Sequence, residues 1–246
     1  MANDSYLFGW HTVDAVLNRA SESIYEIYVD KQRDDERSRQ LQSQADRLGL
    51  SIQRVEKKQL DKFVTDANHQ GVVLRCRLPK PRNQNEINDH IVELDEMPFV
   101  LVLDGVTDPH NLGACLRSAD AAGVNTVVIP RDKAVGLTPV VCKVASGAAH
   151  VLPIFQVSNL VQTMKLLQKQ GIWFYGTSGE AEQSLYETEL TGALGIAMGA
   201  EGKGMRRLTM EQCDFLVNIP MQGSVSSLNV SVATGVVLFE ALRQRQ

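Results

Sequence analysis

Three polar loops carry the side chains best suited to chemistry. The first, DGVTDPHNLGACLRSAD, places Asn111 and Arg117 near the start of one expected helix. The buried face of that helix is predicted by residues at spacings of three and four, namely Leu112, Cys115, Leu116 and Ala119. Arg117 lies off this face and leans toward the helix N-terminus, because helical side chains tilt that way. It could contact a substrate there, and a surface pair with Asp120 fits the local pattern equally well.

The second loop, IAMGAEGKGM, places glycines at 199, 202 and 204 around Glu201. Glycine lets a backbone approach a ligand closely, yet the spacing fits neither the G-x-G-x-x-G dinucleotide fingerprint nor a P-loop. Glu201 could act on a ligand or accept backbone N–H bonds. The cations that follow, Lys203, Arg206 and Arg207, could contact phosphates or form the solvated start of a helix.

The third loop, IPMQGSVSSLNVSVATG, has no charged side chain between Ile219 and Gly235. Ser226, Ser227 and Asn229 are all good helix caps, but capping accounts for only one of them. A phosphate-rich cofactor normally brings a Lys or Arg into its loop. The loop therefore predicts a flat, mostly uncharged ligand held by backbone groups, such as an adenine and its ribose, and S-adenosylmethionine is the obvious candidate.

The elements that position these loops read as an α/β fold. Short apolar strands alternate with helices, which predicts a parallel sheet covered on both faces. The expected strands are FVLVLDGV, NTVVIP, VLPIF, WFYGT, LGIAMG and FLVNIP. We expect helices from Asn111, which caps the first after Pro109, over 139–149, over 159–169 and at the C-terminus. The buried residues expected in the last helix are Val230, Ala233, Val236, Val237 and Leu242. Function then belongs to loops at the carboxyl ends of the strands.

The first part of the chain is predicted to be a separate small α/β domain over 1–78. Helical patterns near 11–18 and 34–48 alternate with strands near 24–29, 51–55 and 72–78. PKPRNQNEIND, rich in proline and amides, predicts a linker over 79–96 before a second domain over 97–246. From Arg54 to Arg82 eight basic residues face three acidic ones, which fits an RNA-contacting surface or a solvated face.

The composition excludes several classes of protein. In 246 residues, 43% are hydrophobic and 22% charged, which is typical of a soluble globular protein, and the net charge of −4 argues against coating nucleic acid by bulk electrostatics. The four cysteines form no C-x-x-C pair, so we expect neither a metal site nor disulfides, and a cytoplasmic location. No leader pattern opens the sequence and the apolar runs are too short for a bilayer, so no membrane partner is expected.

The three loops together resemble the three motifs of the SpoU (TrmH) family of RNA ribose 2′-O-methyltransferases. The pattern N-x-G-x-x-x-R, the glycine loop around Glu201 and IPMQGSVSSLNVSVATGVVLFEALRQ occur in the family's order. GWHTVDAVL and HQGVVLRC are similar to the family's small N-terminal substrate-binding domain, so the resemblance covers nearly the full chain. Within the family, the chain most resembles enzymes that methylate a guanosine ribose in the peptidyl-transferase region of large-subunit (23S) ribosomal RNA.

The resemblance implies a fold, a cofactor and a set of site residues. The fold is a C-terminal α/β-knot (SPOUT) domain with a deep trefoil knot, which physical rules alone do not predict, preceded by a small α/β RNA-binding domain. It also implies a homodimer with S-adenosyl-L-methionine bound against the interface. The implied cofactor-binding residues are Thr177, Met198, Gly199, Ile219 and Leu228. The implied catalytic residues are Asn111, Arg117, Glu201, Ser227 and Asn229.

The chemistry required is transfer of a methyl group to a ribose hydroxyl. The family mechanism makes the arginine a general base, but a guanidinium normally stays protonated. We therefore expect Arg117 to stabilise the developing alkoxide and hold the adjacent phosphate, while Ser227 and Asn229 orient the ribose. His110 could serve as the base, although a hydrogen-bonding scaffold role is favoured.

Three functions are compared. They are ribosomal RNA methylation, the same chemistry on transfer RNA, and a non-catalytic role in RNA binding or ribosome assembly. The extra N-terminal domain favours a large structured RNA, and the complete set of motif residues favours catalysis. A nicotinamide-dependent oxidoreductase is weaker, because the fingerprint spacing is absent.

Overall fold

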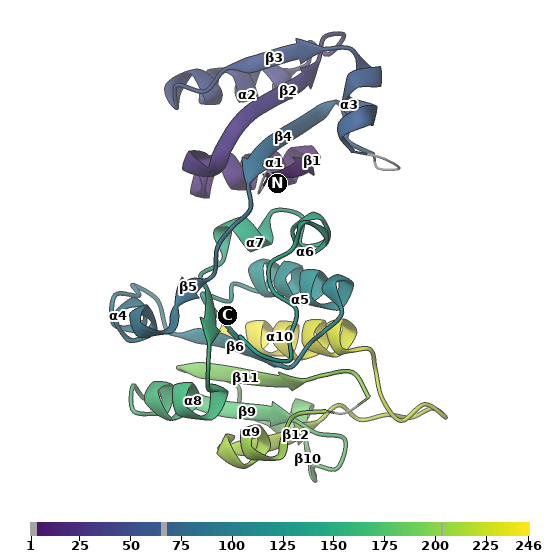
Figure 1. Ribbon diagram of the computed structural model, residues 1–246. Coiled ribbons are helices and arrows are strands. Elements are labelled where there is room, and N and C mark those ends of the chain that lie inside the picture. Colours follow the sequence, from purple (N-terminus) through teal and green to yellow (C-terminus); the bar gives the residue numbers. More distant parts are fainter. Residues whose placement is uncertain (1–3, 65–67, 203) are drawn as a thin grey trace. The chain divides into compact units, whose positions relative to one another are not determined.

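The computed structural model describes residues 4–64, 68–202 and 204–246. The chain divides into two compact units. The first contains Met1–Lys80 and Leu137–Val151, and the second contains Pro81–Gly136 and Leu152–Gln246. Figure 1 shows both units as α/β structures. Each unit is described below by itself.

The first unit is built on a four-stranded sheet in the order β1-β4-β2-β3. Its strands are β1 (Asp4–Phe8), β2 (Ile24–Asp30), β3 (Ile52–Val55) and β4 (Val72–Arg77). β4 pairs antiparallel with β1 and β2, whereas β3 pairs parallel with β2. Its helices are α1 (Trp10–Arg19), α2 (Glu36–Arg47), α3 (Lys57–Phe63), α6 (Pro139–Val144) and α7 (Ala148–Val151), with a short 3-10 turn η1 (Ser21–Ser23).

The segment predicted as one helix over 139–149 is broken into α6 and α7. Ser146 and Gly147 lie between them with φ of 51° and 94°. Such positive φ values end a right-handed helix. The Thr12 hydroxyl donates to the Ser146 carbonyl at 3.1 Å, and this bond holds the break in place against α1.

The second unit is an eight-stranded sheet, and every strand pair in it is parallel, which confirms the predicted fold class. The strand order is β10-β12-β9-β11-β6-β7-β8-β5. The strands are β5 (Arg82–Asn83), β6 (Phe99–Asp104), β7 (Thr126–Pro130), β8 (Ile154–Val157), β9 (Trp173–Thr177), β10 (Gln183–Ser184), β11 (Leu194–Gly199) and β12 (Phe215–Asn218). The helices and 3-10 turns are η2 (Gln84–Glu86), α4 (Ile87–Val92), α5 (Pro109–Ala121), α8 (Leu160–Gln168), η3 (Leu185–Glu187), α9 (Arg207–Gln212) and α10 (Val230–Arg245).

The direction of strand addition reverses between β6 and β11. The chain runs outward from β6 to β7 and β8, and then crosses to β9 on the other side of β6. β11 fills the gap between β9 and β6. In open parallel sheets, ligands bind beyond the carboxyl ends of the strands where the order reverses. The topology thus places a binding site next to the loops that follow β6 and β11.

The structure differs from the expected linker over 79–96. β5 in this segment pairs with β8, and α4 buries Ile87 and Ile91 in the core of the second unit. The buried face of the short helix α4 consists of only two isoleucines, four residues apart. That signal is too short to stand out from the polar composition around it.

The two helices that frame the motif loops, α5 and α10, pack against each other. α5 begins at Pro109, and its N-cap is Asp108, whose side chain accepts the Asn111 N–H at 2.8 Å, so the expected cap at Asn111 is wrong. Proline is favoured at a first helical position because its missing N–H is not needed there. The predicted buried residues of α5 are confirmed.

The buried face of α10 is only partly as predicted. It consists of Val230, Thr234, Val237, Leu238 and Ala241. Ala233, Val236 and Leu242 are half-buried instead. Small residues at 234 and 241 allow close approach, and the Cys115 thiol of α5 donates to the Thr234 hydroxyl at 3.5 Å. The prediction missed Thr234 because a hydrophobicity pattern places apolar residues, such as Ala233, in the core and polar residues outside it.

Candidate active site

A cavity of about 610 Å³ lies at the carboxyl ends of β9, β11 and β12. Its walls come from the strand ends, the glycine loop after β11 and the polar loop before α10. All five residues expected to bind a cofactor line it, namely Thr177, Met198, Gly199, Ile219 and Leu228. Glu201 and Ser227 of the expected catalytic group line it as well. Segments distant in the sequence therefore meet in one cavity.

The loop after β11 requires glycine at Gly199. A Cβ at this position would lie 2.1 Å from the carbonyl carbon of Gly204 and from the amide nitrogen of Met205. Ala200 and Gly204 exchange two backbone hydrogen bonds, of 3.0 and 2.9 Å, which close a tight turn. Gly202 and Gly204 have φ of 74° and 65°, where a side chain is strained. Lys203 lies outside the described residues.

The chemistry of the lining suits an adenosyl group. Glu201 is the only charged side chain among the described lining residues. The remaining surface is formed by apolar side chains such as Met198, Ile219 and Leu228, by small polar residues and by exposed backbone. Adenine and ribose need apolar walls with a few backbone hydrogen bonds, whereas a phosphate tail needs cations. The residues present thus fit a nucleoside-like cofactor without phosphates.

Asn111, Glu201 and Asn229 form a hydrogen-bonded cluster at the reversal between β6 and β11. Asn111 Nδ2 donates to Glu201 Oε2 at 2.9 Å. Asn229 Nδ2 donates to Asn111 Oδ1 at 3.0 Å and to Glu201 Oε2 at 3.3 Å. One residue from each of the three motif loops is therefore held by the other two, and a carboxylate acceptor strengthens two of the bonds.

Asn229 also caps α10, which fixes the orientation of its amide. Its Oδ1 accepts the Ser231 N–H at 2.9 Å and the Ser231 hydroxyl at 2.6 Å. With the oxygen occupied by the helix end, the amide nitrogen must point toward Glu201 and Asn111. Of the three polar residues expected as caps, Asn229 is the one used, and Ser227 remains exposed at the cavity.

Arg117 is the one expected site residue that the described cavity and cluster do not include. It lies exposed on α5, beyond Asn111 on the same helix. His110 is also exposed at the start of this helix and does not belong to the described lining. Neither side chain reaches the cavity of its own chain in this arrangement.

Asp104 is a site residue that the sequence patterns did not single out. It ends β6, its side chain is completely buried, and its Oδ2 accepts the Arg206 N–H at 2.8 Å. Its Oδ1 lies 3.3 Å from Arg206 Nη1. This acid ties the loop after β11 to the end of β6. The available signal was an aspartate closing the apolar run FVLVLD.

No cysteine is among the described residues that line the cavity. Burial raises the pKa of Cys115 to about 11 and that of Cys213 to about 12. Because the thiolate is the nucleophile, neither side chain is reactive near neutral pH.

Comparison with known proteins identifies the family. Residues 98–239 match the model of the SpoU rRNA Methylase family. Residues 6–82 match the model of an RNA 2′-O ribose methyltransferase substrate binding domain. The chain belongs to the SpoU rRNA methylase family.

Similar proteins extend over the whole chain. A protein from Shewanella oneidensis named 23S rRNA (guanosine-2′-O-)-methyltransferase RlmB is 53% identical over 246 residues, covering 100% of both chains. The crystal structure of an RNA 2′-O ribose methyltransferase matches with a TM-score of 0.75 and 27% identity, over 98% of this chain and 89% of that one. The SpoU methyltransferase AviRb from Streptomyces viridochromogenes, solved with AdoMet, has the same fold with a TM-score of 0.75 and 20% identity, over 98% of this chain and 90% of that one.

Proposed function

We infer that this protein methylates the ribose 2′-hydroxyl of a guanosine in 23S ribosomal RNA and takes the methyl group from S-adenosyl-L-methionine. The observation that carries the inference is the convergence of the three motif loops on one cavity with a fixed polar cluster beside it. The relative from Shewanella oneidensis, which matches over its full length, is named for this reaction.

The cofactor assignment depends on the chemistry of the cavity. Its described lining has one acid and no cation, and the tight turn after β11 that forms part of its wall closes only because Gly199 has no side chain. AviRb, which has the same fold, is described in complex with AdoMet. When bound, this cofactor supplies a methyl group on a sulfonium, which is already a good leaving group. The protein must then align the ribose and accommodate the developing negative charge.

We propose that Asn229 and Ser227 position the ribose and that the Asn111–Glu201–Asn229 cluster keeps them fixed. Arg117 would stabilise the developing alkoxide and the neighbouring phosphate. Because Arg117 of the same chain is exposed away from the cavity, we propose that the partner subunit's Arg117 completes each site. A permanently protonated guanidinium suits electrostatic stabilisation better than proton abstraction.

A homodimer is proposed on the basis of the outer face of α10. Val232 and Phe239 are 52% and 49% exposed, and the half-buried Val236 lies between them at helical spacing. Large apolar side chains aligned on one helix face are typical of an interface. This face adjoins the loop of the third motif, so a subunit docked there would lie beside the cavity.

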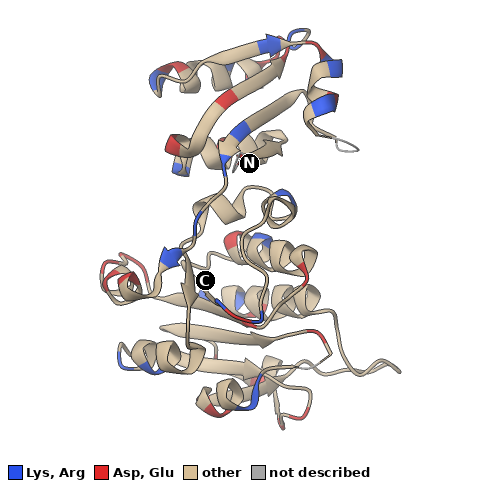
Figure 2. Ribbon diagram, viewed as in Figure 1, with Lys and Arg blue, Asp and Glu red and all other residues tan. Residues whose placement is uncertain are grey.

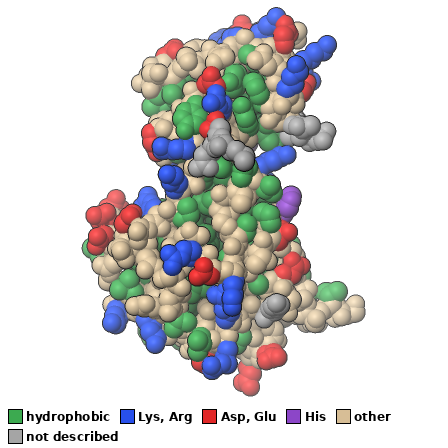
Figure 3. Space-filling view, in the orientation of Figure 1, with side chains coloured by type: hydrophobic (Ala, Val, Ile, Leu, Met, Phe, Trp, Pro, Cys, Tyr) green, Lys and Arg blue, Asp and Glu red, His purple; other side chains and the backbone are tan. Residues whose placement is uncertain are grey.

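We propose that the N-terminal unit binds RNA through α3. Its Lys57, Lys58 and Lys62 are exposed, and Figure 2 shows the basic colouring along this helix. Figure 3 shows Lys and Arg scattered over the face in view and no continuous basic surface there, and the net charge is −4. Phosphate contacts are therefore expected at local groups of lysines and not through the overall charge of the protein.

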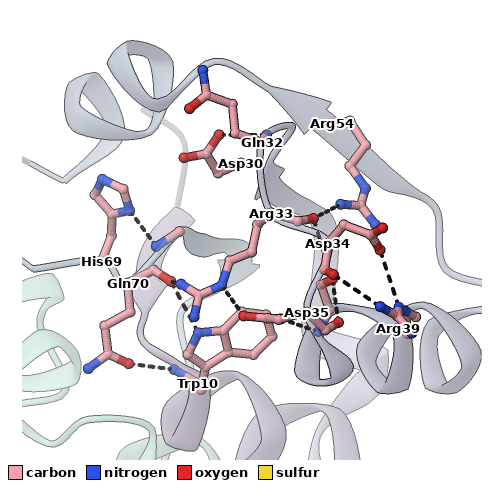
Figure 4. A network of polar contacts seen from close by, with 12 residues as sticks. Trp10, Asp30, Gln32, Arg33, Asp34, Asp35, Arg39, Arg54, His69 and Gln70 are labelled. Atoms are coloured by element: carbon pink, nitrogen blue, oxygen red, sulfur yellow. Dashed lines mark hydrogen bonds and ion pairs between the residues drawn. The ribbon is translucent and has the colours of Figure 1, made fainter.

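Other cations of the N-terminal unit have structural partners instead. Arg33 Nε donates to Asp35 at 2.6 Å, and the same guanidinium bonds the Gln70 carbonyl and lies 5.1 Å from the Trp10 ring centroid (Figure 4). Arg54 donates to the Arg33 carbonyl at 2.6 Å. These bonds join the turn after β2 to the loop before β4 through Gln70 and to β3 through Arg54. Within the basic segment predicted from Arg54 to Arg82, Arg54 therefore has a structural partner, whereas Lys57, Lys58 and Lys62 are exposed.

A cytoplasmic location is proposed because the thiols are reduced. All four cysteines are free, which suits a reducing compartment. Within the described residues, no helix combines the length and apolar character needed to cross a membrane.

The test is methyl transfer from tritiated S-adenosylmethionine to 23S ribosomal RNA fragments and to transfer RNA in parallel. We expect incorporation into a 23S fragment and none into transfer RNA. Incorporation into transfer RNA alone would overturn the substrate. Absence of incorporation into either RNA, with cofactor binding intact, would support a non-catalytic RNA-binding protein and overturn the proposed reaction.

A further inference from the structure

A second cavity, of about 370 Å³, lies at the same carboxyl edge of the sheet on the other side of the strand reversal. It opens beyond the ends of β7 and β8 and is bounded by the starts of α8 and α9. The loop after β11 contributes to both cavities, through residues 199–202 and 204 to the first and through Arg206 to the second. None of the roles assigned above uses this cavity.

The lining of the second cavity is basic. Among the described lining residues, Lys133, Arg206 and Arg207 are basic and Asp132 is the single acid. Leu160 and Val161 of the first turn of α8 also line it. The Asn159 side chain caps this helix by accepting the Gln162 N–H at 3.0 Å. The first-turn amides before Gln162 have no partner within the helix, and they add positive potential to that of the cations.

The cations are held in place by the fold. The buried carboxylate of Asp104 accepts the Arg206 N–H and faces its guanidinium at 3.3 Å. Gly105, which follows Asp104, has φ of 83°, a conformation that favours glycine, and the Arg206 guanidinium lies beside it. Lys133 has φ of 57°, an uncommon conformation for a lysine. Arg207 pairs with Glu211 at 2.5 Å on the surface, where a phosphate can compete for it.

We propose that this second cavity binds a backbone phosphate of the RNA strand that carries the methylated ribose. This proposal rests on the proposed function, because it requires an RNA substrate at the polar cluster. The cluster lies at the ends of β6 and β11, and β7 is the strand next to β6. Adjacent strands are about 4.8 Å apart, so the second cavity lies a few strand spacings from the cluster. An RNA strand whose target ribose lies at Asn229 can thus place a neighbouring backbone phosphate in the second cavity.

The ligand chemistry is that of a phosphate group, and its source is either RNA or free phosphate. The geometry favours RNA, since the cavity shares a loop with the cofactor cavity and faces the same edge of the sheet. Free phosphate, by contrast, would bind at this cavity whether or not RNA is present. The experiment therefore has one arm for each source.

The first arm uses variants of the full-length protein. Lys133→Asn removes the charge and keeps a residue that tolerates positive φ, and Arg207→Gln removes a second charge. Each should weaken binding of the 23S fragment roughly tenfold. Each should also lower the slope of log affinity against log salt by about 1. Cofactor affinity by calorimetry should not change. The matched control is Lys165→Gln, an exposed cation on α8 outside the cavity, and it should leave RNA binding unchanged.

The second arm replaces single RNA phosphates by uncharged methylphosphonates. One position should weaken binding to the unaltered protein and have no effect on binding to Lys133→Asn, because the two changes remove the same contact. Inorganic phosphate at millimolar concentration should not displace the 23S fragment from the protein. The proposal is overturned if no methylphosphonate position loses its effect in Lys133→Asn. It is also overturned if inorganic phosphate alone binds tightly at this cavity. These binding readouts are independent of methyl transfer, so they separate this proposal from the proposed reaction.

Discussion

At the scale of single residues, Glu201 organises the site through one carboxylate oxygen that accepts bonds from two amides. Glu201→Gln removes the charge and leaves a neutral, weaker acceptor for the two amides. We expect the single-turnover rate of methyl transfer to fall about a hundredfold, because the ribose-orienting Asn229 loses its fixed position. Cofactor affinity by calorimetry should change little. The control Glu187→Gln alters an exposed acid outside the cavity. An unchanged rate in Glu201→Gln would remove the cluster from the mechanism.

Gly199 gives a second prediction with a matched control. Gly199→Ala places a methyl group 2.1 Å from backbone atoms of Gly204 and Met205, which forces the glycine loop to open. We expect cofactor affinity by calorimetry to fall by about a hundredfold or more, together with a lower melting temperature. Gly179→Ala alters the same cavity at a position with nothing within 4 Å. It should bind the cofactor almost normally, and equal losses in both variants would contradict the close-approach argument.

At the scale of elements, the exposed face of α10 predicts the oligomeric state. Val232→Asp with Phe239→Asp places two charges on the proposed interface, where burying them is costly. We expect the variant to sediment as a monomer and to lose methyl transfer, while its circular dichroism stays unchanged. Tyr186→Asp, at another exposed aromatic residue, should remain dimeric. A wild-type protein that is monomeric at micromolar concentration would exclude the proposed dimer.

The long periodic elements could be predicted from the sequence, and the short ones could not. The run FVLVLD and the buried residues of α5 carry unambiguous apolar patterns. α4 depends on two isoleucines, and the break between α6 and α7 depends on a tertiary bond between Thr12 and Ser146. A pattern within a few residues cannot report such long-range contacts.

The candidate site divides in a similar way. Its residues were predicted through motif resemblance, and the cavity and cluster bring nine of the ten together. The pair of Asp104 and Arg206 escaped prediction because its partners are 102 residues apart in the chain. The knot that the resemblance implies stays a prediction, since threading leaves no trace in hydrophobic periodicity.

At the scale of the whole molecule, a mixed dimer can show which subunit supplies Arg117. Arg117→Ala and Glu201→Gln subunits are each inactive alone in this account. After exchange, a dimer with two-fold symmetry that uses Arg117 across the interface regains one complete site. With half of the dimers mixed, about one quarter of the wild-type rate should return. Activity no higher than that of the separate variants would place Arg117 in the site of its own chain.

The most direct test of the central claim is to locate the transferred methyl group. The protein is incubated with S-adenosylmethionine carrying a deuterated methyl group and a 23S ribosomal RNA fragment, and the RNA is digested to nucleosides for mass spectrometry. The account predicts the label on the ribose of a guanosine as 2′-O-methylguanosine, and its loss with Arg117→Ala. A label on a base, on another nucleoside, or on no nucleoside at all would contradict the account.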